Sequence, residues 1–161
     1  MLKILTLLSP FFEDVYSEIS IREYGRLSGI SPPSAAKQLR EFEKESLIFS
    51  QKRGIYIYYK ANTEQFLFKE LSKMYWYSLL FPLTEKLHAN VMYRNVVLFG
   101  SIVKSENTKN SDIDLYLDTS PKKIELESLQ KKLHRKIELH FINAKKNEHL
   151  KKNIERGIII R

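Results

Sequence analysis

The sequence predicts an α+β protein in which a helix-turn-helix domain over residues 1–62 precedes a mixed sheet flanked by helices over residues 63–161. In the first range, two short helical stretches around a glycine are followed by two β-prone runs around a polar loop. In the second range, strand-like segments of alternating apolar and polar residues are separated by amphipathic helical stretches. A chain of 161 residues with 43% hydrophobic content can bury a core, and its lack of cysteine excludes disulfides and thiolate metal sites.

The chain is basic, with a formal net charge of +8 at pH 7. Residues 1–62 carry 9 Lys and Arg against 7 Asp and Glu, and residues 63–161 carry 18 against 12. This excess favours an anionic partner such as nucleic acid or a nucleotide, although it also serves solubility. The longest apolar run, Tyr75–Leu83, is interrupted by Ser78 and Pro82 and is too short for a membrane span. We therefore expect a cytoplasmic protein without a membrane partner.

Three helical stretches are expected near the N-terminus. The first covers Leu2–Leu8 and ends at Pro10, because proline has no N–H to continue a helix. The second covers Glu13–Ile19. The third, Arg22–Ser28, ends before Gly29, which suits the positive φ of a tight turn.

The next helix is expected to begin with Ser31 as its N-cap and Pro32 at its first position. Its apolar residues follow helical spacing and form one buried stripe, made by Ala35, Leu39 and Phe42. The opposite face is polar and carries Ser34, Lys37, Gln38, Glu41 and Lys44. Two helices joined by a glycine-containing turn form the helix-turn-helix pattern, whose second helix enters the major groove of DNA.

Two β-prone runs, residues 47–49 and 55–60, surround a polar loop that contains Gly54 and predict a hairpin. A basic hairpin directly after a helix-turn-helix resembles the wing of winged-helix domains. The resemblance covers residues 1–62 and implies that double-stranded DNA is bound by Ser34, Lys37, Gln38, Lys44, Lys52 and Arg53. Three carboxylates near this helix weaken its positive field: Glu41, Glu43 and Glu45. The alternative is therefore a domain that serves only for dimerisation or for contact with another protein.

Residues 63–90 are expected to form connecting helices, because apolar residues recur at helical spacing until Pro82 breaks or kinks the helix. Packing between the two domains, or contact between two copies of the chain, would explain the broad apolar face. Since winged-helix proteins that read DNA often pair to match two half-sites, we expect a homodimer.

The second domain contains two further amphipathic helices and two further strands. In one of these strands Glu138 and His140 share a face, and His140 is expected to be structural or to lie at the rim of a site. In chain order the elements are a helix over Pro121–Lys132, a strand over Lys136–Ile142, a helix from Glu148 to Gly157 and a short strand over Ile158–Ile160.

The segment from Val96 to Leu117 contains most of the residues that could bind a ligand or take part in a reaction. A hydrophobic strand, Val96–Phe99, leads into a Gly100-Ser101 turn, which offers backbone N–H groups and a hydroxyl to phosphate oxygens. The later strand alternates, so Asp112 and Asp114 lie on one face. Two neighbouring carboxylates repel each other, and a divalent cation between them removes this repulsion.

The spacing of these residues, G-S-x10-D-x-D, resembles the nucleotidyltransferase superfamily related to DNA polymerase beta. Over residues 65–161 the sequence resembles that of the minimal nucleotidyltransferases, which includes a carboxylate on a later strand, here Glu138. Three features depart from the family pattern. Lys104 and Ser105 stand where Arg-Gly is usual, Glu138 stands where Asp is usual, and the ten-residue loop contains no glycine.

The resemblance implies a catalytic site formed by Asp112, Asp114 and Glu138, which hold two Mg²⁺ ions. It further implies that Gly100 and Ser101 contact the phosphates of an NTP and that Lys104 adds positive charge. The expected reaction transfers NMP, with ATP as the expected donor, to an acceptor hydroxyl on a protein or another substrate. Minimal nucleotidyltransferases commonly act as antitoxins that modify a tyrosine of a HEPN-type partner protein, so the resemblance implies an antitoxin-like role beside such a partner, while the sequence itself does not name the acceptor.

One alternative function remains open from the sequence. The nucleotidyltransferase-like fold can persist without catalysis, as a domain that binds a nucleotide or a partner protein. In that case the chain is a DNA-binding transcriptional regulator.

Overall fold

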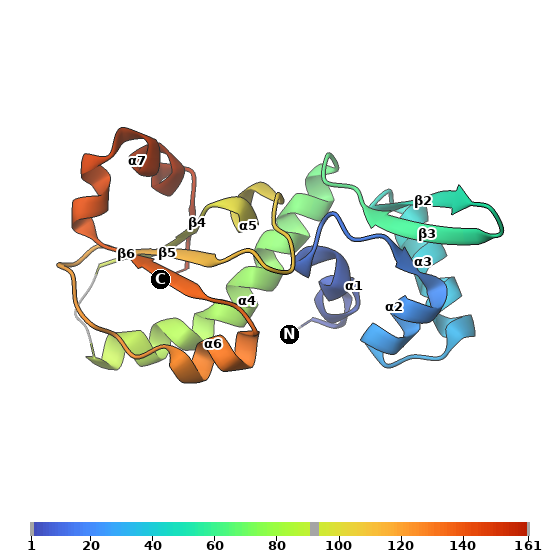
Figure 1. Ribbon diagram of the computed structural model, residues 1–161, viewed down its shortest axis with the longest axis horizontal. Helices are drawn as coiled ribbons and strands as arrows, with labels where there is room; N and C mark the ends of the chain where they lie inside the picture. Colours follow the sequence, from blue (N-terminus) through green and yellow to red (C-terminus); the bar gives the residue numbers. More distant parts are fainter. Residues whose placement is uncertain (1, 91–93, 161) are drawn as a thin grey trace. The chain divides into compact units, whose positions relative to one another are not determined.

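The computed structural model describes residues 2–90 and 94–160 as helices and two separate sheets, in agreement with the predicted α+β class (Figure 1). The chain divides into unit 1, Met1–Tyr75 with Ser105–Lys109, and unit 2, Trp76–Lys104 with Asn110–Arg161. The division falls inside α4 (Phe66–Asn90), whereas the sequence suggested a boundary after residue 62. This helix is continuous through Pro82, so the proline does not break it.

Unit 1 combines helices with a three-stranded antiparallel sheet in the order β1-β3-β2. Up to the hairpin, its elements are α1 (Lys3–Glu13), β1 (Ile19–Ser20), α2 (Ile21–Ser28), α3 (Pro32–Lys44), β2 (Ile48–Arg53) and β3 (Tyr56–Ala61). The predicted hairpin is confirmed, and Gly54 in its loop has a φ of 61°.

Helix α1 continues past Pro10 to Glu13, so the predicted end of this helix is wrong. Pro10 cannot donate to the carbonyl of Thr6, but the hydroxyl of Ser9 donates to this carbonyl over 2.8 Å and satisfies it.

The helix predicted over Glu13–Ile19 is absent from this part of the structure, because Asp14 organises a turn instead. The backbone N–H of Tyr16 donates to Asp14 Oδ1 over 3.1 Å, and that of Ser17 donates to the Asp14 carbonyl over 3.2 Å. A short polar side chain that binds its own backbone competes with helix formation.

The two helices of the predicted helix-turn-helix are confirmed as α2 and α3. Gly29 ends α2 with a φ of 65°, and the hydroxyl of Ser31 accepts from the N–H of Ser34 at the start of α3. The stripe expected on α3 is buried, since Ala35, Leu39 and Phe42 are each at most 3% exposed.

Residues Ser105–Lys109 contribute a hydrogen-bond anchor to unit 1. Asn107 is fully buried, and its side-chain amide donates to the carbonyls of Phe12 over 2.8 Å and of Glu13 over 3.1 Å. The Asn107 carbonyl accepts in turn from the N–H of Val15 over 3.1 Å. Because the last carbonyls of a helix have no partner within it, Asn107 caps the C-terminus of α1.

Unit 2 is built on a mixed sheet in the order β6-β5-β4-β7, with β5 and β6 parallel and the other pairs antiparallel. After α4 its elements are β4 (Val96–Phe99), α5 (Ser101–Lys104), β5 (Ile113–Leu117), α6 (Glu127–Leu133), β6 (Ile137–His140), the 3₁₀-helix η1 (Ile142–Lys146), α7 (Glu148–Glu155) and β7 (Ile158–Ile159). The predicted C-terminal strand is confirmed, since Ile159 pairs with Val97.

Helix α6 begins at Glu127, later than the predicted start at Pro121. The spacing of two between Ile124 and Leu126 does not fit a helix, and only the apolar residues from Leu126 onward are three or four apart.

Different helices pack on the two faces of this sheet. On one face, a small apolar core joins Val97, Phe99 and Tyr116 to Ile154 of α7. Figure 1 shows α6 on the opposite side of the sheet from α7. In the described ranges, no helix combines the length and apolar character of a membrane span.

Candidate active site

Neighbouring strands of unit 2 place two of the predicted catalytic carboxylates side by side. Asp114 on β5 is the register partner of Glu138 on the parallel strand β6, and on its other side it is the partner of Phe99 on β4. Residues in register on adjacent strands direct their side chains to the same face of a sheet. Glu138 therefore lies beside Asp114 although 24 positions separate them in the sequence.

The turn after β4 packs directly against Asp114. Gly100 has a φ of 82°, and a Cβ atom built on it would overlap the Asp114 carboxylate. Ser101 follows as the first residue of α5 and is half-buried, while Lys104 at the end of α5 is exposed. The backbone of the Gly-Ser turn therefore lies directly against Asp114, the second aspartate of the D-x-D motif.

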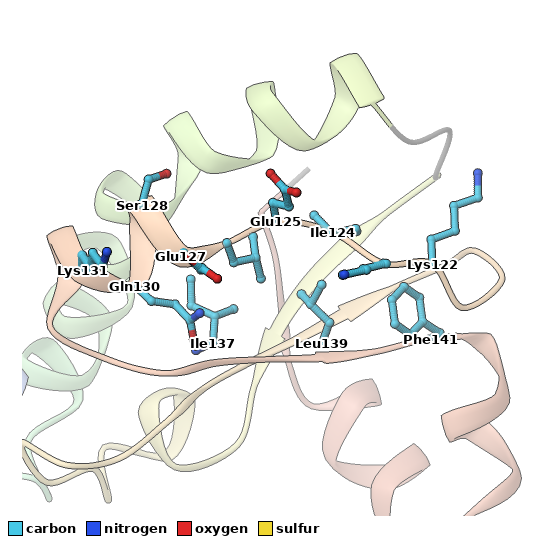
Figure 2. Close-up of a pocket in the computed structure, with 12 residues that line it drawn as sticks. Lys122, Ile124, Glu125, Glu127, Ser128, Gln130, Lys131, Ile137, Leu139 and Phe141 are labelled. Carbon is cyan, nitrogen blue, oxygen red and sulfur yellow. Dashed lines mark hydrogen bonds between the residues drawn. The ribbon is translucent and has the colours of Figure 1, made fainter.

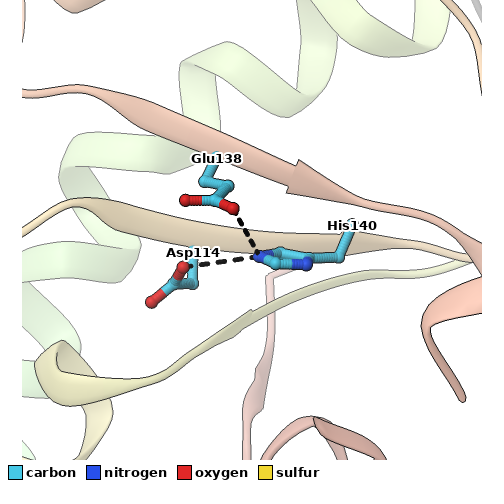
Figure 3. Close-up of side chains that lie close together, drawn as sticks. All are labelled: Asp114, Glu138 and His140. Atoms are coloured by element: carbon cyan, nitrogen blue, oxygen red, sulfur yellow. Dashed lines mark hydrogen bonds and ion pairs between the residues drawn. The ribbon is translucent and has the colours of Figure 1, made fainter. Parts of the chain in front are cut away.

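Glu138 is shared between two groups of side chains. Its Oε1 lies 4.0 Å from His140 Nε2, which is also 3.4 Å from Asp114 Oδ1 (Figure 3). Its Oε2 lies 3.6 Å from Lys136 Nζ, and this ammonium is 3.5 Å from Asp112 Oδ2. Asp112 is therefore linked to the other carboxylates through Lys136.

Two groups of this cluster have raised pKa values, Asp114 chiefly through burial and Lys136 through neighbouring charges. Burial raises the pKa of the Asp114 carboxyl, and the negative charges of Glu138 and Asp112 add to this effect while His140 opposes it. The carboxylates of Asp112 and then Glu138 raise the pKa of the Lys136 ammonium. The raised pKa of Lys136 reflects the negative charge of these carboxylates, which also attracts other cations.

The donor set is suited to a divalent cation. Asp114, Glu138 and His140 each offer one ligand atom, and these atoms lie within 4.8 Å of one another. Carboxylate oxygens are ligands for Mg²⁺, Mn²⁺ and Ca²⁺, and imidazole nitrogen is a ligand for first-row transition ions. The residues present therefore fit a bound metal.

Two residues of this cluster did not emerge from the sequence as site residues, namely Lys136 and His140. His140 was expected to be structural or to lie at a rim. The sequence feature that could have identified both is the alternation along β6 and the residue before it, which puts residues 136, 138 and 140 on one face.

A cavity of about 870 Å³ lies beside β6 and is lined by residues of the segment before α6, of α6 and of β6 (Figure 2). Its apolar wall is formed by Ile137, Leu139 and Phe141, which alternate with Glu138 and His140 along the chain. The rest of the lining combines apolar, polar and charged side chains: Ile124, Leu126, Ser128, Gln130, Lys122, Lys123, Lys131, Glu125 and Glu127. This cavity is therefore separate from the carboxylate cluster.

The residues expected to bind DNA belong to unit 1. On α3, Ser34, Lys37 and Lys44 are exposed, whereas the half-buried Gln38 donates to Glu41 over 3.4 Å. Arg40, which the sequence analysis did not select, is exposed on the same helix. The polar face of α3 is therefore more basic than expected.

Glu43, one of the three glutamates on and after α3, accepts a hydrogen bond from the backbone of the hairpin. Its Oε1 accepts from the backbone N–H of Ser50 over 3.0 Å. Because β2 is an edge strand, this bond satisfies a donor that has no partner strand.

The two cations at the hairpin tip differ in their surroundings. Lys52 is exposed, and Arg53 forms an ion pair of 2.7 Å with Glu18. Glu18 also lies 3.6 Å from Lys60. A phosphate bound by Arg53 would compete with this carboxylate.

Comparison with known proteins agrees with the geometry of unit 2. Residues 83–161 match the model of a family described as polymerase beta, nucleotidyltransferase. The chain has no significant match among curated proteins or solved structures. The matched range contains the Gly-Ser turn and all three predicted carboxylates, and it supports the nucleotidyltransferase superfamily for this part of the chain, with nucleotidyl transfer as the general activity.

Proposed function

We propose that unit 2 transfers a nucleoside monophosphate from an NTP, with ATP as the expected donor, to an acceptor hydroxyl. The observation that supports this most strongly is the adjacency of Asp114 and Glu138 behind the turn at Gly100, within the range that matches the nucleotidyltransferase family. In this reaction the acceptor oxygen forms a bond to the α-phosphorus, the bond from the α-phosphorus to the bridging oxygen breaks, and pyrophosphate leaves.

The residues have distinct roles in this proposal. Asp112, Asp114 and Glu138 would hold Mg²⁺, which when bound neutralises charge on the triphosphate and on the leaving pyrophosphate. The turn at Gly100 and Ser101 would bind phosphate oxygens through its N–H groups and hydroxyl, and Lys104 would add positive charge. Glu138 would accept the proton of the acceptor hydroxyl, which is the task of a general base.

The test uses the purified full chain with Mg²⁺ and ATP labelled on the α-phosphate. Protein and nucleic-acid acceptors are offered, and transfer of label and release of pyrophosphate are both measured. We expect both signals with the unchanged chain and neither with Asp112→Asn combined with Asp114→Asn. Glu125→Gln, a matched change in the lining of the cavity beside β6, is expected to retain them. Absence of label and of pyrophosphate with every acceptor would contradict the proposal.

We further propose that the acceptor is a hydroxyl on a HEPN-type toxin, which would make the chain an antitoxin-like enzyme. This proposal follows the resemblance to minimal nucleotidyltransferases. It is tested by co-expression with the product of a neighbouring HEPN-type gene, followed by mass spectrometry of that product. An added mass of one nucleotide is expected, and an unmodified partner that remains toxic would contradict the proposal.

A second function is proposed for unit 1, binding of double-stranded DNA by a winged helix as a homodimer. The supporting observation is the exposed basic face of α3, with Lys37, Arg40 and Lys44, next to a hairpin that carries Lys52. If unit 2 is inactive, this would make the chain a transcriptional regulator.

A gel shift with the chain's own promoter region tests this second function. Affinity should fall as salt rises, and each lost phosphate contact should reduce the slope of that dependence by about 1. We expect Lys37→Ala with Lys44→Ala to weaken binding and the α1 change Lys3→Ala to leave it unchanged. Binding without salt dependence, or equal binding by the double variant, would contradict it.

A further inference from the structure

We infer that His140 is a metal ligand and that it makes the carboxylate site prefer a first-row transition ion such as Mn²⁺ to Mg²⁺. The inference rests on the proposed function only in using the same carboxylates, Asp114 and Glu138. It adds a nitrogen ligand where the nucleotidyltransferase resemblance implies oxygen ligands alone.

The position of His140 follows from the topology of the sheet. It lies two residues after Glu138 on β6 and therefore shares its face, and its register partner on β5 is Tyr116, two residues after Asp114. This arrangement puts its Nε2 at 3.4 Å from Asp114 Oδ1 and at 4.0 Å from Glu138 Oε1. The three side chains converge on one point in Figure 3.

The imidazole is held in this orientation by packing. Its ring meets the ring of Phe99 at an interplanar angle of 64°, with the centroids 5.0 Å apart. The side chain is 18% exposed, which limits its alternative rotamers. Phe99 itself is part of the apolar core under α7, so the support for His140 is rigid.

The chemistry of the donor set then decides the preferred ion. Mg²⁺ requires oxygen ligands in near-octahedral geometry and retains several waters, so an imidazole contributes little to its binding. Imidazole suits Fe²⁺, Ni²⁺ and Zn²⁺ best, and Mn²⁺, which binds carboxylates as Mg²⁺ does, has the lowest affinity of the first-row ions. Mn²⁺ is therefore the strictest probe of an imidazole ligand among these ions. Two carboxylate oxygens and one imidazole nitrogen therefore favour the transition ion.

Lys136 explains why the ion should bind on the His140 side of Glu138. Its ammonium lies within 3.6 Å of both Glu138 Oε2 and Asp112 Oδ2. A positive charge of the chain is therefore already placed between these two oxygens, and it would repel a second cation there. Glu138 Oε1, Asp114 and His140 form the side where a cation meets this repulsion least.

The test measures metal binding to the full chain without nucleotide. Free Mn²⁺ is followed by electron paramagnetic resonance during a titration, and displacement by Mg²⁺ gives the ratio of the two affinities. We expect His140→Ala to lower Mn²⁺ affinity by about tenfold or more, because changes even outside the ligand shell cost about 10–100-fold. Mg²⁺ affinity should change by less than about twofold. The matched control is His149→Ala, an exposed histidine on α7, which should bind as the unchanged chain does.

His140→Asp separates a ligand role from a structural one. It restores a ligand but supplies oxygen in place of nitrogen, so metal binding should return with the preference moved toward Mg²⁺. Circular dichroism and thermal unfolding in a chelator verify that each variant folds. The inference is overturned if His140→Ala leaves the ratio of Mn²⁺ to Mg²⁺ affinity unchanged, or if the unchanged chain binds Mg²⁺ as tightly as Mn²⁺.

Failure of the inference is distinguishable from failure of the proposed function. Nucleotidyl transfer with an unchanged metal ratio in His140→Ala would contradict only the inference. Preferential Mn²⁺ binding that depends on His140, in a chain that transfers no nucleotide to any acceptor, would contradict only the transfer reaction.

Discussion

Gly100 leaves free the space that the carboxylate of Asp114 fills. A Cβ atom at this position would overlap the carboxylate, and the φ of 82° is itself unfavourable for other residues. Gly100 and Asp114, which thirteen residues separate in the sequence, are thus fitted to each other.

We predict that Gly100→Ala abolishes metal binding, because the new methyl group displaces the Asp114 carboxylate. The change should also destabilise unit 2 by more than the about 1–2 kcal/mol that a left-handed backbone costs. Isothermal titration with Mn²⁺ and denaturant unfolding measure the two effects.

Gly54→Ala is the matched control for Gly100→Ala, because Gly54 also has a positive φ, of 61°, but its added Cβ would meet nothing within 4 Å. Gly54→Ala should lower stability through its left-handed backbone but should bind the metal as the unchanged chain does. Normal metal binding by Gly100→Ala would contradict the fit between the turn and Asp114.

Lys136 competes with a bound cation for Asp112 and Glu138. We predict that Lys136→Ala tightens Mn²⁺ and Mg²⁺ binding by about two- to fivefold, because exposed charge pairs have only modest effects. The carboxylates raise the pKa of this ammonium, so it remains charged across the neutral range. Lys132→Ala on α6 controls for the general loss of positive charge, and weaker binding by Lys136→Ala would contradict the prediction.

The cap that Asn107 provides for α1 predicts a graded loss of stability. Asn107→Ala leaves the buried carbonyl of Phe12 and the partly buried carbonyl of Glu13 without this donor and should lower the free energy of unfolding by about 1–3 kcal/mol. Asn107→Asp should cost more, since a carboxylate would face the carbonyl oxygens of Phe12 and Glu13. Denaturant unfolding measures both, with the exposed Asn143→Ala as control. Equal stability of the Ala and Asp variants would argue against the cap.

Two buried tyrosines of unit 1 predict sensitivity to alkaline pH. Burial raises the pKa of Tyr24 and of Tyr59; for Tyr59 the charge of Glu43 adds to this and that of Arg40 opposes it. The unfolded phenols ionise near pH 10, so the stability that the neutral phenols confer is complete below about pH 10 and is lost as pH rises through the folded pKa values.

The alkaline effect is measured by denaturant unfolding at about pH 8 and about pH 11. Tyr59→Phe should reduce the loss of stability between the two conditions, because phenylalanine does not ionise. Tyr16→Phe, at an exposed tyrosine, should leave the loss unchanged. An equal loss in Tyr59→Phe and the unchanged chain would contradict the assignment.

Local signals in the sequence were sufficient for much of the fold. Gly29 and Ser31 marked the turn and the start of α3, and alternating apolar residues marked β5 and β6. The placement of Glu138 beside Asp114 requires only that these two strands pair in register, which the resemblance implied and the structure shows.

The errors came where a side chain acts outside the local pattern. The hydroxyl of Ser9 replaces the bond that Pro10 cannot make, and the carboxylate of Asp14 forms a turn where propensity allowed a helix. The period of two along β6 puts Lys136 and His140 on the face of Glu138, but it does not reveal that Lys136 meets Asp112 and that His140 meets Asp114. The membership of Ser105–Lys109 in unit 1 likewise depends on contacts with residues far away in the sequence.

That membership means that the two units share three chain crossings, at residues 75, 104 and 109, so no single cut separates them. A fragment that starts at residue 83, where the family match begins, would contain Asn107 without Phe12 and Glu13, its hydrogen-bond partners. A loop from the later part of the chain therefore belongs to the earlier unit. Any fragment that separates this loop from residues 1–75 leaves the Asn107 amide without the carbonyls that accept from it.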